Sequence, residues 1–176
     1  MKDRTTMSAT AVRTSQIRGR LFRGRLSLVV YQNGVIAARR AASNMVLRGG
    51  AALIAQLYSG GAGAKPIDTI GVGFGTAPGG ADMTALTLPD ARAAIPAAAL
   101  RTAIPGTAFS VVTDQADAVQ VKIAALFHPT QDLTGVTEAG LSAGDTLYNQ
   151  VIFEAVNLRV GQDVTFFWQI DFPFGH

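Results

Sequence analysis

The fold class of this chain is decided by three segments near its end, Val136-Thr-Glu-Ala-Gly-Leu141, Thr146-Leu-Tyr-Asn-Gln-Val-Ile-Phe153 and Asp163-Val-Thr-Phe-Phe-Trp-Gln-Ile-Asp-Phe172. Their β-branched and aromatic residues are typical of strands, and only short loops separate them. The run from Gly135 to Phe174 therefore predicts consecutive β-strands of a small sandwich protein and not a catalytic site.

Strand patterns also precede this run. Asn33-Gly34 stands between the apolar runs 26–31 and 35–38. It indicates a hairpin because both turn residues tolerate positive φ. Further strands are expected over 67–74, 107–113 and 118–127, the last two forming a second pair. Pro89, Pro96 and Pro105 prevent a long helix in the Ala-rich stretch 86–105, so it should be extended, with edge-strand character.

One helix is predicted between these strands. From Asn44 the apolar residues have helical spacing, and Ser59-Gly60-Gly61 ends the pattern. A helix of about three turns fits, with Asn44 as the candidate cap. Gly49 and Gly50 weaken it by about 1 kcal/mol each relative to Ala, so packing must hold it. With about eight strands and one short helix, the chain is predicted to be a mainly β, antiparallel β-sandwich.

Composition favours assembly over a free monomer. Of the 176 residues, 48% are hydrophobic and only 15% charged, with 19 glycines, which excludes a highly charged disordered chain. This length suffices for one well-cored domain. So few charges leave an apolar surface, which a partner or further copies of the chain often cover.

The first residues form a distinct segment. Residues 1–24 contain few large apolar side chains and cannot bury enough surface to become ordered by themselves. We therefore predict a flexible basic arm over 1–24 and a β-sandwich domain over 25–176. Through Arg48 the chain has ten basic residues against the single acid Asp3, and the remainder has five basic and eleven acidic residues, giving about +9 and −6. The basic end of one copy could attract the acidic body of the next.

Motifs for chemistry are weak. There is no cysteine, and the two histidines, His128 and His176, form no metal-ligand spacing. Glu138 and Asp145 could converge in a hairpin, but Glu138 is better explained as a solvated side chain or a partner for turn backbone groups. We expect no catalytic residue, no cofactor and no metal.

The glycine-rich stretch Gly71-Val-Gly-Phe-Gly-Thr-Ala-Pro-Gly-Gly80 fails as a nucleotide loop. Thr76 stands where the dinucleotide fingerprint needs its third glycine, and Pro78 prevents the helix that should follow. The Gly-Lys-Ser/Thr element of a phosphate loop is also missing. A turn between strands is the favoured interpretation.

Two features indicate binding to partners. The cluster Arg18-Gly-Arg20-Leu-Phe22-Arg23-Gly-Arg25 could contact phosphates. Single-strand binding usually adds several aromatics, so a solvated or protein-bound arm is favoured, with nucleic acid as the alternative. On the last strand, Phe166 and Trp168 share one face and Phe167 the other, so one face would meet the core and the other a neighbour. The candidate partner-binding residues are Arg13, Arg18, Arg20, Arg23, Arg25 and Phe167.

Membrane association is not expected. The N-terminus is too polar for a secretory signal, and no apolar run approaches the roughly 20 residues that a bilayer span needs. The product should be cytosolic when made.

Two regions resemble a family of small bacteriophage structural proteins found among tail, neck and fibre genes. The first region joins Asn44-Met-Val-Leu-Arg-Gly-Gly-Ala51 to Ile70-Gly-Val-Gly-Phe-Gly-Thr-Ala-Pro78, similar to an Asn-led helix followed by a Gly-x-Gly-Thr strand and turn. The second contains Thr137-Glu-Ala-Gly-Leu141, Leu147-Tyr-Asn-Gln150 and Val164-Thr-Phe-Phe-Trp-Gln-Ile170, similar to the closing strands of that family. The basic arm and the Pro/Ala stretch lie outside the resemblance.

This resemblance implies a non-enzymatic virion component with no catalytic residues to transfer. It would be a symmetric oligomer at the neck, tail, baseplate or fibre attachment, made in the host cytoplasm, with copies of itself and other virion proteins as partners. Two alternatives are a capsid decoration (cement) protein and a receptor- or glycan-binding module. The latter should present aromatics in loops, whereas here they lie in strands.

Overall fold

The computed structural model describes residues 22–61, 64–88 and 95–174 of the chain. Arg13, Arg18 and Arg20 of the predicted basic arm lie outside the described residues. The strand and helix bounds are β1 Arg23–Gln32, β2 Val35–Val46, α1 Arg48–Ser59, β3 Thr69–Gly73, η1 Ala97–Leu100, β4 Arg101–Ala103, η2 Gly106–Ala108, β5 Phe109–Val112, β6 Ala118–Phe127, β7 Leu133–Ala143, β8 Thr146–Leu147, β9 Asn149–Leu158 and β10 Asp163–Pro173.

All of these strands belong to one antiparallel sheet. Its order is β4-β3-β7-β9-β2-β1-β10-β6-β5, and β8 pairs with β7. The chain is mainly β with one α-helix among the described residues, which confirms the predicted fold class. The described part has ten strands rather than about eight, because the segment predicted as one strand from Thr146 is divided into β8 and β9, and the Ala-rich stretch contributes the short strand β4.

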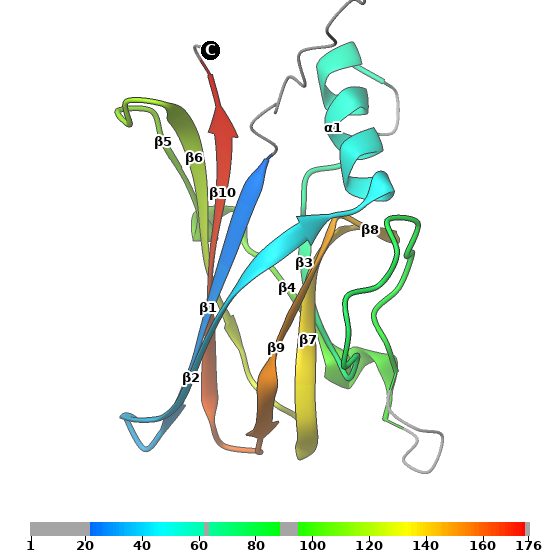
Figure 1. The fold of residues 1–176 in the computed structure, drawn as a ribbon. Coiled ribbons are helices and arrows are strands. Elements are labelled where there is room, and N and C mark those ends of the chain that lie inside the picture. The colour runs from blue at the N-terminus through cyan, green and yellow to red at the C-terminus, as the bar shows by residue number, and fades with distance from the viewer. Residues whose placement is uncertain (1–21, 62–63, 89–94, 175–176) are drawn as a thin grey trace, which may run out of the picture.

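The sheet curls until its two halves face each other. In Figure 1, β3, β7 and β9 form one half and β1, β10 and β6 the other, with β2 connecting them. The predicted sandwich layers are therefore two halves of one continuous sheet. At the far side the Thr102 hydroxyl of β4 donates to the carbonyl of Leu126 in β6 at 3.4 Å, so the two ends of the sheet approach each other.

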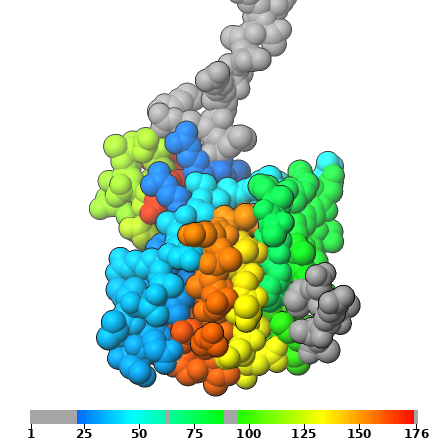
Figure 2. Space-filling model, turned by 60° about the horizontal axis from the view of Figure 1, so that its bottom comes forward, coloured from blue at the N-terminus to red at the C-terminus, as the bar shows by residue number. Residues whose placement is uncertain are grey.

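The junction between β2 and β9 is only partly paired. Backbone pairing is limited to Asn44–Val46 against Asn149–Val151, where Figure 2 shows β2, β9 and β7 next to one another. Beyond this point a side chain replaces backbone pairing. The Arg40 guanidinium donates hydrogen bonds to the carbonyls of Glu154 and Ala155, each at 2.8 Å. A side chain thus satisfies β9 carbonyls where the two layers separate.

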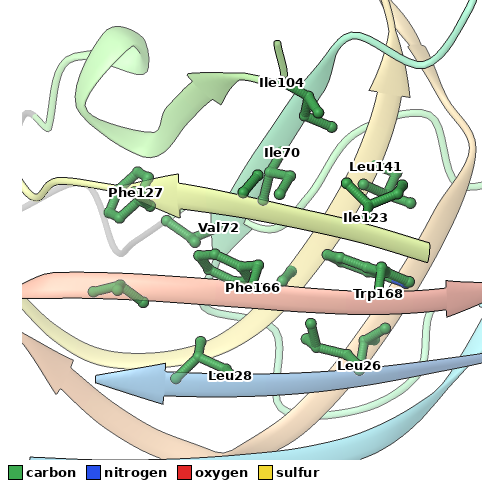
Figure 3. Packing of buried hydrophobic residues seen from close by; sticks show 14 of the residues in the cluster. Leu26, Leu28, Ile70, Val72, Ile104, Ile123, Phe127, Leu141, Phe166 and Trp168 are labelled. Atoms are coloured by element: carbon green, nitrogen blue, oxygen red, sulfur yellow. The ribbon is translucent and has the colours of Figure 1, made fainter. Parts of the chain in front are cut away.

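The core fills the space between the two halves. Phe166 and Trp168 of β10 stack with ring centroids 6.4 Å apart. Figure 3 shows these rings, together with side chains of β1 and β6, opposite residues of β3 and β7. The labelled core residues are Leu26, Leu28, Ile70, Val72, Ile104, Ile123, Phe127, Leu141, Phe166 and Trp168. Burial of this apolar surface supplies the main driving force for the curl.

The predicted Asn-Gly hairpin is confirmed. Strands β1 and β2 meet at Asn33 and Gly34, whose φ angles are 53° and 75°. The second predicted pair, β5 with β6, is also present. Strand β1 begins at Arg23, two residues before the expected start of the domain at residue 25.

The helix ends as predicted but begins later. Gly60 ends α1 in the left-handed conformation with φ 64°. The prediction of Asn44 as the helix cap was wrong, because Asn44 lies in β2, opposite Gly24 and Val151. Leu47 occupies the cap position and makes no side-chain hydrogen bond there. Sheet pairing of Asn44 and burial of Leu47 against the core outweigh the local capping preference.

The Ala-rich stretch follows the expectation only in part. Strand β4 is at one end of the sheet order, but the 3-10 turn η1 precedes it, and residues 89–94 lie outside the described part.

Candidate functional site

The outer face of β10 carries an aromatic side chain that the fold leaves uncovered. Phe166 and Trp168 point into the core and are at most 1% exposed, whereas Phe167 between them is 43% exposed. The alternation follows from the two-residue period of a strand. The prediction that Phe167 lies on the opposite face from its neighbours is confirmed.

Small residues surround Phe167 on the neighbouring strands. In the strand register, Ser27 of β1 and Ala124 of β6 flank Phe167 directly, and Ala41 of β2 lies beyond Ser27. Ala108, next to the start of β5, extends this row. These short side chains leave a groove of about 490 Å³ beside the ring. We call this surface the Phe167 groove.

Exposed cations border the Phe167 groove. Arg25 of β1 and Lys122 of β6 flank Gln169 in the row next to Phe167. The side chains of Arg25, Gln169 and Lys122 line the groove. Arg39 of β2 is one row further on the other side, by the same alternation. In the part of the chain that the structure describes, Arg25, Lys122 and Arg39 have no ion pair and no side-chain hydrogen bond. The groove thus combines an apolar floor with a positive rim, a surface suited to an acidic partner with an apolar side chain.

A second feature is a buried carboxylate on the outer face of the opposite half. Glu138 of β7 is 0% exposed. One of its oxygens accepts hydrogen bonds from the backbone N–H of Thr87 at 2.8 Å and of Gly75 at 3.2 Å, and the other accepts from the Gln150 amide at 2.5 Å. Gln150 also accepts from the N–H of Gly79 at 2.8 Å. Glu138 and Gln150 together hold residues 75–87 over the sheet.

This network explains the glycine-rich stretch. A Cβ at Gly73 would collide with the Glu138 carboxylate, and a Cβ at Gly75 would collide with the Thr87 hydroxyl and lie only 3.1 Å from the same carboxylate. Its first three residues end β3 and the remainder forms the loop after this strand, as expected. Its glycines permit close approach to a buried acid rather than to a phosphate. Glu138 is not solvated, so that part of the expectation was wrong, while its role as a partner for turn backbone groups is confirmed.

The other titratable candidates do not combine into a site. Asp145 is exposed at the turn between β7 and β8 and does not share the buried environment of Glu138. His128 and Asp163 form an exposed pair at 3.1 Å. His176 lies outside the described residues. Within the described ranges, no group of three or more His, Cys, Asp or Glu side chains could hold a metal ion.

The structure unites only part of the predicted partner-binding set. Arg25 and Phe167 line one groove, and Arg23 extends the same face of β1 at its start. Lys122, Arg39 and the small floor residues were not identified from the sequence. Their signal was the alternation within each strand, but only the register between strands places them beside Phe167.

Comparison of the chain with protein-family models, with curated proteins and with solved structures found no match. Among the described residues, no helix has the length and apolar character required to cross a membrane.

Proposed function

We propose that this protein is a non-enzymatic structural component of a phage virion. It assembles as a symmetric oligomer in the neck, tail, baseplate or fibre-attachment region and binds neighbouring virion proteins. The observation that carries the proposal is the Phe167 groove, in which an exposed aromatic ring lies on a small-residue floor, bordered by cations that have no ion pair within the described residues.

Such a surface favours a binding role. An exposed phenyl ring costs free energy in water, and aromatic residues with arginine are enriched at protein interfaces. Phe167 is presented by a central strand of the sheet rather than by a mobile loop. A rigid, preformed surface binds with a small loss of conformational entropy, as a permanent assembly requires.

The buried carboxylate supports a structural role as well. Glu138 is the best-buried acid of the described part, and its oxygens are occupied by hydrogen bonds that hold a loop. Residues that carry the family resemblance also contribute to the fold, because Tyr148, Asn149 and Gln150 are all buried. Asn149 accepts a hydrogen bond from the N–H of Leu141 at 2.9 Å. The motifs that resemble phage structural proteins thus stabilise the fold.

The test is to locate the chain in particles of the phage that encodes it. Particles would be purified, labelled with gold-conjugated antibody against the chain, and viewed by electron microscopy. Gold at the neck, tail or baseplate is the expected result. Gold over the head would instead support the decoration protein, and absence of the chain from particles would refute both.

A truncated chain tests the predicted basic arm in the same particles. Deletion of residues 1–23 should lower incorporation if the arm contacts a neighbour. A binding assay with DNA at low salt serves as the comparison, because nucleic-acid affinity would fall steeply as salt rises. Normal incorporation of the truncated chain would remove the arm from the proposal and leave the Phe167 groove.

A further inference from the structure

We propose that the Arg40 side chain is a latch that holds residues 152–158 of β9 against β2, and that this part of β9 opens when the latch is released. The opening exposes two strand edges that Arg40 otherwise keeps from pairing with another chain. The inference concerns the closure of the sheet and does not depend on the proposed virion role.

We call the contact between β2 and β9 the seam. Its backbone ladder is short, because three residue pairs join 44–46 to 149–151, whereas nine pairs join β1 to β2 and nine join β1 to β10. Figure 1 shows β2 and β9 diverging beyond this ladder, toward the β1–β2 hairpin. Residues 35–43 of β2 and 152–158 of β9 have no backbone pairing with each other.

The pairing of this part of β9 with β7 is irregular as well. Val136 pairs with Val156, and Glu138 pairs with Ile152. Two steps along β7 thus correspond to four steps along β9, so β9 bulges over residues 153–155. A bulge leaves backbone groups outside the ladder, and these groups need other partners.

Arg40 supplies partners at this bulge. Its Nε donates to the carbonyl of Glu154 and one terminal nitrogen donates to the carbonyl of Ala155, each at 2.8 Å. The other terminal nitrogen donates to the carbonyl of Arg39 on β2 at 2.7 Å. Every guanidinium nitrogen therefore has an acceptor, and the acceptors lie on both sides of the seam. The Glu154 carboxylate adds an ion pair at 3.6 Å, but it is 85% exposed and contributes little.

The direction of the Arg40 side chain also fits a latch. Arg40 pairs with Leu28, which is 0% exposed, so both belong to the core-facing row of their strands. A charge on that face is costly unless hydrogen bonds satisfy it, and here the carbonyls do so. Inward-pointing charges are one means by which proteins keep free strand edges from pairing with other chains. Arg40 thus closes the seam and guards the edges on either side of it.

Amide hydrogen exchange of the purified full-length chain, followed by mass spectrometry, tests the latch. Arg40→Ala should raise the exchange rate of residues 152–158 by about tenfold or more, because exchange requires local opening and two charge-assisted hydrogen bonds that oppose the opening are lost. Strands β6 and β10 should exchange as in the wild type. Arg40→Lys should raise the same rate by less, since one ammonium cannot reproduce the fork geometry of a guanidinium. Circular dichroism confirms that each variant is folded.

Two control variants separate the latch from simple loss of charge. Glu154→Ala removes the ion pair and leaves the hydrogen bonds between Arg40 and the β9 carbonyls in place. Arg101→Ala removes an exposed positive charge on β4, away from the seam. Both variants should leave the exchange rate of residues 152–158 within about threefold of the wild type.

Sedimentation velocity at a fixed protein concentration follows the guarded edges. The R40A chain should form larger species than the wild type, because the facing edges of β2 and β9 become free to pair with strands of other copies. The E154A chain, whose latch is intact, should sediment as the wild type does. Unchanged sedimentation of R40A would overturn the guarding of these edges.

Two exchange results would overturn the latch itself. One is an R40A chain in which residues 152–158 exchange as in the wild type, and the other is a rise of equal size in every strand, which would report lower global stability instead of local opening. The location of the chain in particles is an independent readout. Gold label at the tail together with either exchange result would retain the virion role and reject the latch.

Discussion

Glu138 shows at the residue scale how one acid can hold a loop in place. Replacement by alanine would leave the N–H groups of Gly75 and Thr87 and the amide of Gln150 without their shared acceptor. Because unsatisfied buried donors are costly, we expect E138A to lower the free energy of unfolding by about 3 kcal/mol. Urea titration followed by circular dichroism measures this. The control is Glu154→Ala, whose side chain is 85% exposed and whose loss should change stability by less than about 1 kcal/mol. Equal effects of the two variants would contradict the assigned role.

Tyr148 predicts a dependence of stability on alkaline pH. Burial raises the pKa of its phenol from 10.0 to about 12, and its hydroxyl has no hydrogen-bond partner within the described residues. Since the folded-state pKa is above the unfolded-state value, the contribution of Tyr148 is complete below about pH 10 and is lost as pH rises through about 12, by about 3 kcal/mol in total. Tyr148→Phe should be close to neutral at pH 7 and should remove this part of the decline. Denaturant titrations at pH 7 and at several pH values above 10 compare the two chains; an identical decline in both would refute the assignment.

At the scale of elements, local sequence signals predicted what local physics determines. Asn33-Gly34 fixes its own hairpin because both residues adopt positive φ, and Gly60 ends α1 for the same reason. The prediction of Asn44 as a helix cap failed because capping contributes a local free energy of only about 1 kcal/mol. Strand pairing and burial together contribute more. The burial of Glu138 could not be read from the sequence either, since the loop that covers it is 51 to 63 positions away along the chain.

Docking of α1 gives a prediction in which packing opposes helix propensity. Gly50 is buried against Tyr148, and a methyl group there would meet the backbone carbonyl of Tyr148. Propensity alone would make Gly50→Ala stabilising by about 1 kcal/mol. Because backbone cannot yield as a side-chain end can, we expect G50A instead to lower the free energy of unfolding by about 1 to 3 kcal/mol.

The exposed helix residue Ala52 supplies the matched control for this change. Ala52→Gly reports the propensity term of the same helix without a packing change and should cost about 1 kcal/mol. Thermal unfolding of the three chains decides between the two terms. A G50A chain more stable than the wild type would show that α1 is not pressed against Tyr148.

At the scale of the whole molecule, the curl of the sheet brings together what the sequence keeps apart. The strands were predictable one by one, but their order was not. Strand β2 is next to β9, and β1 next to β10, across most of the chain length. This strand order buries a common core, which contains residues from both ends of the chain. Burial of that apolar surface is the driving force that brings these strands together. The same register places Ser27 and Ala124 beside Phe167 and Lys122 in the next row, so the groove could be found only after the strands had been paired.

Adjacent aromatic residues on β10 separate stability from assembly and so test both functions of this strand. Trp168 is 1% exposed and stacks on Phe166 in the core, so Trp168→Ala should lower the free energy of unfolding by about 3 to 5 kcal/mol through loss of buried area and the cavity left behind. Phe167 is 43% exposed, so Phe167→Ala should change stability by less than about 1 kcal/mol and should weaken self-association, because its ring is the apolar centre of the groove. Urea titration at low protein concentration measures the free energy of unfolding, and sedimentation velocity of folded chain measures self-association.

Loss of association in W168A without loss of stability would place Trp168 at the interface instead of the core. Normal association of F167A would show that the Phe167 ring is not the apolar centre of the contact between copies.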